Sequence, residues 1–257
     1  MNILLTNDDG VNSDGILKLA EALRSEGKHK VSVVAPDVNR SGISHALSIF
    51  NNAVKLTRLG EDTWSCTGYP ADCIIAGING LLSERPDLIL SGINNGANLG
   101  TDIIYSGTAS AARQGGLGGI PSIALSLSGD PPYHWDMAVF WIAGHLEELL
   151  SYWREYTFVN VNIPNNPDGP KGVILSWPAA KIYKDSLSIA VANDGSRYCF
   201  LEGGEDTTFV EPGSDCDVVS RNFVSVSSVY NYPAVVRELC PGAPDFAALG
   251  LRSGKRK

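Results

Sequence analysis

The stretch "ILLTNDDGVNSDG" (residues 3–15) decides the fold, because an apolar run in it ends on two adjacent carboxylates. The run at 2–6 is short and mostly apolar, which predicts a buried β-strand. Asp8 and Asp9 follow almost at once, and two like charges side by side repel each other. Either a positive group lies beside this pair, or the pair is open to water in a loop.

Strands and helices alternate through the first part of the chain. Apolar runs predict strands, and helical spacing of apolar residues predicts the segments between them. Nearly continuous apolar strands separated by helices indicate an α/β fold, with a mostly parallel sheet covered by helices on both faces. From about residue 172, short alternating segments predict antiparallel ribbons and hairpins. The predicted strands are 2–6, 30–36, 86–93, 120–128 and 156–164. The first predicted helix has Ser13 or Asp14 as its N-cap and stops at Gly27, and the others are 69–84, 107–116 and about 135–153.

Composition excludes several classes of function. The 257 residues carry a formal net charge of −8, which argues against binding a nucleic-acid polymer. No apolar run approaches the roughly 18–20 residues of a membrane helix, and the first strand starts so early that we expect no signal peptide. The cysteines are odd in number and form no C-x-x-C pair, so we expect free thiols, no zinc site and a cytoplasmic protein. They are Cys66, Cys73, Cys199, Cys216 and Cys240.

Polar residues follow three of the predicted strands. Because ligands of parallel α/β sheets bind outside the carboxyl ends of the strands, we expect these three loops to meet at one edge. All three are rich in oxygen ligands and glycine, and Arg40 alone adds a cation. The candidates are Asn7, Asp8, Asp9 and Gly10 in the first loop, Asn39, Arg40, Ser41 and Gly42 in the second, and Asn94, Asn95 and Asn98 in the third.

Two carboxylates with neutral oxygen donors suit a hard divalent cation. Magnesium, manganese and calcium prefer such ligands, whereas zinc and copper prefer others. A cation would also offset the repulsion between Asp8 and Asp9. The alternative is that Asp8 caps the following turn while Asp9 is solvated.

A second feature predicts an anion site. Ser106, Gly107 and Thr108 precede a helix of small residues, and free N–H groups at a helix N-terminus favour an anion. A cation site beside an anion pocket at one edge of the sheet indicates that the ligand is a phosphate ester. His45 is the histidine nearest this edge, either as a proton donor or as a residue at the rim.

Several motifs together resemble the SurE family, the survival-protein-E nucleotidases. The resemblance runs from Met1 to about residue 164 and returns at 211–229, in "EPGSDCDVVSRNFVSVSSV". The motifs are "ILLTNDDG", "VVAPDVNRSGISHALS", "PDLILSGINNGANLG", "IIYSGTASAA", "IPSIALSL" and "FVNVNIP".

The resemblance implies a Rossmann-like core at 1–164 and a C-terminal hairpin and oligomerisation region at 165–257, within one SurE-like domain. It implies metal ligands at Asp8, Asp9, Ser41 and Asn94, with Asp8 and Asp9 catalytic. Phosphate or substrate binding falls on Asn98, Ser106, Gly107 and Thr108, and we assign Asn7 and Asn39 to it as well.

The implied activity is that of a phosphoric monoester hydrolase. Its substrates would be nucleoside 5′-monophosphates, with 3′-monophosphates and short polyphosphate as further possibilities. One Mg²⁺ or Mn²⁺ would bind per subunit, Ca²⁺ being able to occupy the site, and the assembly would be a homodimer or homotetramer. Water or a carboxylate could be the nucleophile. Two alternatives are a non-catalytic nucleotide or metal sensor and a nucleotide-sugar transferase.

The chain departs from the family pattern in places. Tyr69 replaces a threonine in "GYPADC" (68–73), and "ILSWPAA" (174–180) lacks a Thr-Arg pair. These positions lie outside the implied ligands, so they bear on base preference and assembly more than on the chemistry.

Overall fold

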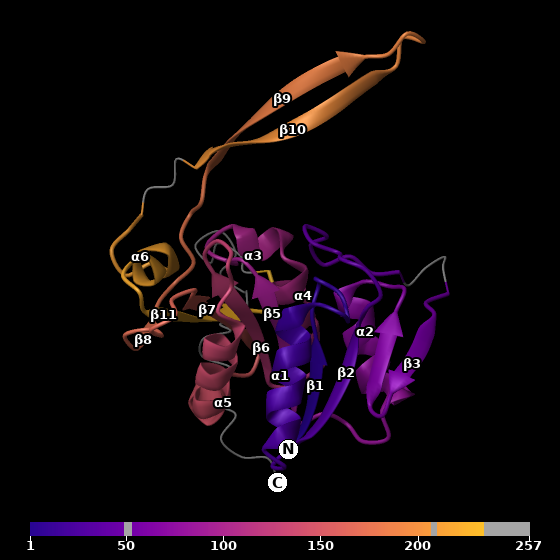
Figure 1. The fold of residues 1–257 in the computed structure, drawn as a ribbon, viewed down its shortest axis with the longest axis vertical. Helices are drawn as coiled ribbons and strands as arrows, with labels where there is room; N and C mark the ends of the chain where they lie inside the picture. Colours follow the sequence, from indigo (N-terminus) through magenta and orange to yellow (C-terminus); the bar gives the residue numbers. More distant parts are fainter. Residues whose placement is uncertain (49–52, 207–209, 234–257) are drawn as a thin grey trace, which may run out of the picture.

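The computed structural model describes residues 1–48, 53–206 and 210–233, so Cys240 lies outside the described residues. A nine-stranded sheet forms the centre of the molecule, in the strand order β3-β4-β2-β1-β5-β6-β7-β11-β8 (Figure 1). Its strands are β1 (Asn2–Thr6), β2 (Lys30–Pro36), β3 (Leu56–Gly60), β4 (Thr63–Cys66), β5 (Leu88–Asn95), β6 (Ser122–Ser128), β7 (Thr157–Pro164), β8 (Val173–Leu175) and β11 (Val224–Tyr230).

The pairing is parallel from β4 through β2, β1, β5 and β6 to β7, which confirms the α/β prediction. Strand β3 pairs antiparallel with β4 at one end of the sheet, and β11 pairs antiparallel with β7 towards the other. The helices are α1 (Asp14–Ser25), α2 (Pro70–Ala76), α3 (Asp102–Tyr105), α4 (Gly107–Leu117), α5 (Trp135–Ser151) and α6 (Asp215–Ser220).

Both faces of the sheet are covered, because alternate residues of each strand point to opposite sides. Ile3 and Leu5 of β1 belong to a large core that includes residues of α1 and α5. Leu4 of the same strand belongs to a second core with residues of α2 and α4. Because strands such as β1 are buried on both faces, their sequences are nearly continuous apolar runs. No helix among the described residues is long and apolar enough to cross a membrane.

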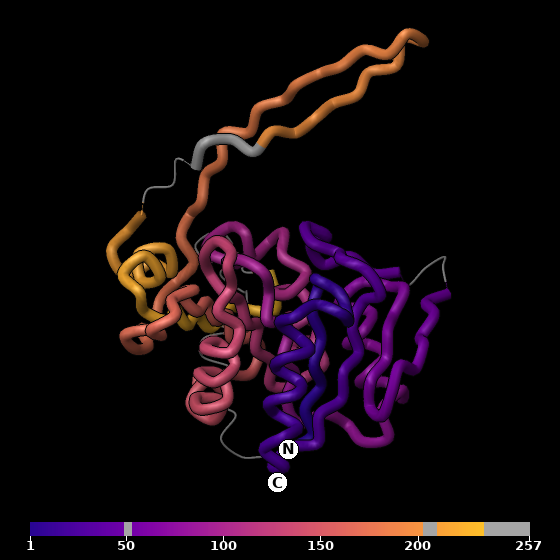
Figure 2. The backbone as a smooth tube through the Cα atoms, viewed as in Figure 1, coloured from indigo at the N-terminus to yellow at the C-terminus, as the bar shows by residue number. Residues whose placement is uncertain are grey.

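The second half of the chain differs in part from its prediction. Strands β9 (Tyr183–Val191) and β10 (Arg197–Asp206) form an antiparallel hairpin that stands clear of the body as a long arm (Figure 2). Strands β8 and β11 join the main sheet and form no separate ribbon; β11 is antiparallel to β7, as expected, but it pairs in parallel with β8, against the prediction. The reason is burial, since Val224 and Val226 of β11 join the large core.

One predicted helix ends earlier than expected, and two short helices were not predicted. Pro70 starts α2 as expected, but the helix stops at Ala76 and a single π turn covers Gly77–Leu81. Gly80 has φ +125° in that turn, a conformation open mainly to glycine. The sequence analysis also missed the short helices α3 and α6, which have four and six residues.

Candidate active site

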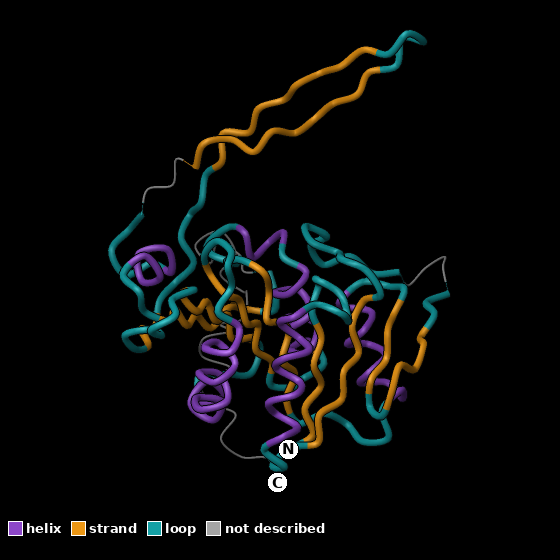
Figure 3. The backbone as a smooth tube through the Cα atoms, viewed as in Figure 1, coloured by secondary structure: helices purple, strands orange, loops and turns teal. Residues whose placement is uncertain are grey.

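The three predicted loops meet at one edge of the sheet and are joined by hydrogen bonds. Figure 3 shows loop segments gathered at this edge, around α3 and the start of α4. The backbone N–H of Arg40 donates to the Asp8 carbonyl (2.7 Å), which ties the loop after β2 to the loop after β1. The backbone N–H of Asn95 donates to Asp9 Oδ2 (3.1 Å), which ties in the end of β5. The predicted convergence is therefore present in the structure.

Asp8 lies at the centre of this edge and is almost completely buried, with 3% of its surface exposed. Its Oδ1 accepts a hydrogen bond from the Thr108 hydroxyl (2.5 Å). Burial raises the pKa of the Asp8 carboxyl, while the Thr108 hydroxyl and the backbone N–H groups of Thr108 and Gly107 partly oppose the rise. The carboxylate thus faces the N-terminus of α4.

Gly107 makes this contact possible. A Cβ built on Gly107 would lie 2.6 Å from Asp8 Cβ and 2.8 Å from Asp8 Oδ2. A side chain there would displace the carboxylate, so the first residue of α4 is glycine for lack of space.

Asp9 carries a second carboxylate next to the first. Burial and the charge of Asp8 raise the pKa of Asp9 to about 6. Neither carboxylate forms an ion pair with a lysine, arginine or histidine side chain in the described part of the chain. Two adjacent carboxylates, one buried and one partly buried, without an ion pair to a basic side chain among the described residues, could together hold a cation.

The neutral donors lie around the same point. Asn94, which has 9% of its surface exposed, turns its Oδ1 toward the Thr108 hydroxyl (3.4 Å), and its Nδ2 donates to the Gly96 carbonyl (3.0 Å). Ser41 is exposed and directly follows Arg40, whose N–H holds the loop to Asp8. Residues 1–48, 53–206 and 210–233 contain no cluster of three or more His, Cys, Asp or Glu side chains suited to a metal. A cation here would therefore need amide, hydroxyl or water oxygens besides the two carboxylates, and such a donor set fits Mg²⁺ or Mn²⁺.

The predicted phosphate residues fall into two groups. Ser106 is the N-cap of α4, and its hydroxyl accepts from the Ala109 N–H (3.0 Å), so its side chain stabilises the helix start. Asn98 is buried, and its Nδ2 donates to Ser126 Oγ (2.8 Å). Gly107 and Thr108 follow Ser106 and contact Asp8, which places the N-terminus of α4 beside this carboxylate.

Asn7 and Asn39 lie in the loops but bond within them. The Asn7 amide donates to the Gly10 carbonyl (2.9 Å) and to Ser13 Oγ (2.7 Å), and it also accepts from the Gly10 N–H. Asn39 Oδ1 accepts from the Ser41 N–H (2.7 Å). Both side chains shape the loops that carry Asp8 and Ser41, and their assignment to substrate binding stays a prediction.

The two nearby basic side chains already have contacts. Arg40 donates to the Thr67 carbonyl (3.0 Å), and its guanidinium lies 5.6 Å from the centre of the Tyr69 ring. His45 shares a hydrogen bond with Gln114 Oε1 (2.9 Å), and burial lowers its pKa. A neutral histidine held in this way is less suited to donating a proton, and that role for His45 stays a prediction.

The sequence analysis missed the support beneath Asn98. Asn160 and Asn162 of β7 both donate to the Asn98 carbonyl (2.9 and 3.0 Å), and Asn162 Oδ1 accepts the Asn98 N–H (2.8 Å). Both asparagines are fully buried. The signal was present in "FVNVNIP" (158–164), because two amides in an otherwise apolar strand need buried partners.

Comparison with known proteins shows the family of the chain. The model of the family described as Survival protein SurE matches residues 3–185 of the chain. The chain belongs to the SurE family. A protein of Thermosipho africanus named 5′-nucleotidase SurE is 39% identical over 235 residues, covering 89% of this chain and 91% of its own. Another of that name, from Syntrophotalea carbinolica, is 40% identical over 237 residues, covering 90% and 91%.

A solved structure extends the SurE relationship to three dimensions. The SurE protein of Aquifex aeolicus superposes with a TM-score of 0.80 at 35% identity, covering 93% of this chain and 99% of its own. The fold class expected from the SurE resemblance is thereby confirmed.

Proposed function

We propose that this chain is a metal-dependent phosphomonoesterase that hydrolyses nucleoside 5′-monophosphates to a nucleoside and phosphate. The observation that carries the proposal is the contact between Asp8 and the N-terminus of α4, through the Thr108 hydroxyl (2.5 Å) and the backbone N–H groups of Gly107 and Thr108. A cation site and an anion site meet at one residue there. The relatives named 5′-nucleotidase SurE support the same substrate class.

Asp8, Asp9, Ser41 and Asn94 would hold one divalent cation, Mg²⁺ or Mn²⁺. When bound, such an ion polarises a phosphoryl oxygen and lowers the pKa of water. Asp8 and Asp9 bring two negative charges to it, and Asn94 lies close to Asp8, since both approach the Thr108 hydroxyl. The buried position of Asp8 keeps water from competing for its carboxylate.

The remaining groups act on the phosphate. Gly107 and Thr108, at the positive N-terminal end of α4 beside Asp8, would stabilise the phosphoryl oxygens through the helix dipole as negative charge moves to the leaving group. Asn98 begins this segment, and three hydrogen bonds between its backbone and side chains of β7 hold it in place. One carboxylate would steer or deprotonate the attacking water.

The assembly is part of the proposal. The arm formed by β9 and β10 exposes more than half of the surface of each of six apolar side chains, and an isolated two-stranded hairpin is marginally stable in water. We infer that the arm packs against further copies of the chain in a homodimer or homotetramer. The six are Leu187, Ile189, Val191, Tyr198, Phe200 and Leu201.

The experiment that tests the substrate class is phosphate release from a matched panel with Mn²⁺ present. The panel contains the 5′-monophosphate, the 3′-monophosphate and the 5′-diphosphate of one nucleoside, together with short polyphosphate. Faster release from the 5′-monophosphate supports the proposal. Comparable rates with the 3′-isomer or with polyphosphate would widen the substrate range, and release from none of them would refute the proposal.

A further inference from the structure

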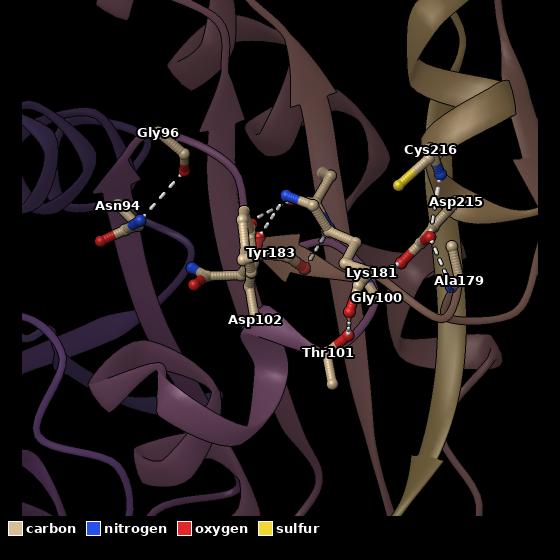
Figure 4. A network of polar contacts seen from close by, with 12 residues as sticks. Asn94, Gly96, Gly100, Thr101, Asp102, Ala179, Lys181, Tyr183, Asp215 and Cys216 are labelled. Atoms are coloured by element: carbon tan, nitrogen blue, oxygen red, sulfur yellow. Dashed lines mark hydrogen bonds and ion pairs between the residues drawn. The ribbon is translucent and has the colours of Figure 1, made fainter. Parts of the chain in front are cut away.

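The segment between Asn98 and Ser106 is fastened to the base of the arm. It contains α3, a helix of only four residues, and leads directly into the N-terminus of α4. Lys181 Nζ lies 2.7 Å from Asp102 Oδ2, and the Tyr183 hydroxyl donates to Asp102 Oδ1 (2.7 Å; Figure 4). One carboxylate therefore joins α3 to two residues where the chain enters β9.

A second contact holds Gly100, two residues before Asp102. The Asp215 carboxylate is fully buried, and it accepts hydrogen bonds from the Gly100 N–H (2.7 Å) and the Ala179 N–H (2.9 Å). Gly100 has φ +55°, and a Cβ there would lie 2.3 Å from the Ala179 carbonyl oxygen. The Thr101 hydroxyl also donates to the Lys181 carbonyl (2.7 Å). Residues 100–102 and 179–183 are thus in contact along their lengths (Figure 4).

The other side of α3 is bonded to the loop after β2. The Ser44 N–H donates to the Tyr105 carbonyl (2.8 Å), and the Ser44 hydroxyl donates to the Ile104 carbonyl (2.7 Å). That loop carries Ser41, one of the proposed metal ligands. Helix α3 therefore lies between the base of the arm and the proposed metal site.

The Lys181–Asp102 ion pair is sheltered from solvent. The side chains are 14% and 22% exposed, and in each other ion pair between described residues at least one side chain is more exposed than either of these. Water and salt screen such a pair less than an exposed one. Burial opposes the charge on Lys181, but its contacts with Asp102 and Tyr183 raise the pKa of Lys181 above its ordinary value. The lysine stays charged at neutral pH.

We propose that Lys181 and Asp215 are positioning residues of the active site, which fix the phosphate-binding segment 98–108 by holding Asp102 and Gly100. This inference rests on the proposed function. Neither residue needs to touch substrate. Each holds the chain at the start of α3, a helix of four residues that is too short to be stable alone.

The test compares Lys181→Met with Lys184→Met, its matched control on the exposed surface of the arm. Steady-state hydrolysis of p-nitrophenyl phosphate with saturating Mn²⁺ gives KM and kcat, and hydrogen exchange gives the protection of amides 99–105. We expect Lys181→Met to raise KM about tenfold and to speed exchange in this segment, which is the scale of such couplings. Lys181→Arg, which keeps the charge, should restore most of both.

Two further variants keep the proposal open to refutation if Lys181→Met does not fold. Tyr183→Phe removes only the hydroxyl that donates to Asp102, and Asp215→Asn keeps one oxygen acceptor for the Gly100 N–H. Each should raise KM in the same direction, by a smaller factor. A KM and an exchange pattern equal to those of Lys184→Met would overturn the proposal. If the wild type releases no phosphate, the proposed function fails. Hydrogen exchange at 99–105 then still tests whether Lys181 and Asp215 hold this segment in place, because that measurement does not depend on activity.

Discussion

Asp8 is the residue on which the cation site and the phosphate site both depend. Asp8→Asn keeps the size of the side chain and an oxygen for the Thr108 hydroxyl, but removes the negative charge. We expect phosphate release to fall at least about 100-fold, as when a preorganised charge is removed from an active site. The fold should persist, because the buried carboxylate has a raised pKa and its charge is unfavourable in the absence of a cation.

The control for this variant is Asp14→Asn, which neutralises an exposed aspartate in the first turn of α1. Circular dichroism should show both variants folded, and phosphate release should remain near that of the wild type in Asp14→Asn alone. Equal activity in Asp8→Asn and the wild type would remove Asp8 from the site.

Asp9 gives a prediction about pH in the metal-free protein. Its pKa is about 6 in the folded state against an ordinary 3.8, so between these values the folded state holds a proton that the unfolded chain has lost. The contribution of Asp9 to the free energy of unfolding therefore falls as pH rises through this window. In EDTA, Asp9→Asn should gain thermal stability relative to the wild type on going from about pH 4 to about pH 7.

Thermal unfolding of both proteins at the two pH values measures this difference. A gap between their midpoints that stays constant or shrinks as pH rises would contradict the prediction. Added Mn²⁺ should stabilise the wild type more than Asp9→Asn, because binding to the folded state alone raises stability.

At the scale of elements, the start of helix α4 packs closely against the loop after β1, which carries Asp8. Gly107→Ala places a methyl group against Asp8, so it should lower activity strongly and cost about 1–3 kcal/mol of stability. Gly144→Ala, in the middle of α5 with open space around it, is the matched control and should gain about 0.5–1 kcal/mol. Chemical denaturation and phosphate release measure the two effects. Equal stability changes in both variants would show that Gly107 is free of Asp8.

The elements of the parallel core were predictable because each is specified locally. The apolar runs of β1 and β2 and the proline that starts α2 are local signals, and their boundaries agree with the structure. The loops that follow parallel strands must share one edge, so the meeting of Asp8 with Asn94 also followed from the order of elements.

The supports of the site were not predictable, because they depend on contacts distant in sequence. Asn162 meets Asn98 across 64 residues, and Asp215 meets Gly100 across 115. Nothing in the local sequence distinguishes Lys181 from a solvated lysine. The placement of β11 beside β7 has the same cause, since strand pairing is decided by the whole sheet.

At the scale of the whole molecule, the arm predicts the state of assembly. Phe200 and Leu187 expose 57% and 53% of their surfaces, which is unfavourable for side chains of this size in a monomer. Phe200→Ser combined with Leu187→Ser should shift the protein to a smaller assembly, as measured by light scattering on a sizing column. Lys184→Met should leave the mass unchanged. A double variant with the wild-type mass would show that the arm is not the contact between subunits.

We expect hydrolysis to need a divalent cation held by the two carboxylates of the loop after β1, Asp8 and Asp9. The most direct test measures phosphate release from a nucleoside 5′-monophosphate by the wild type in EDTA and after Mg²⁺ or Mn²⁺ is restored. We predict that release stops in EDTA and returns with either ion. Release that continues unchanged in EDTA would contradict the account, as would a folded protein that releases no phosphate with either ion.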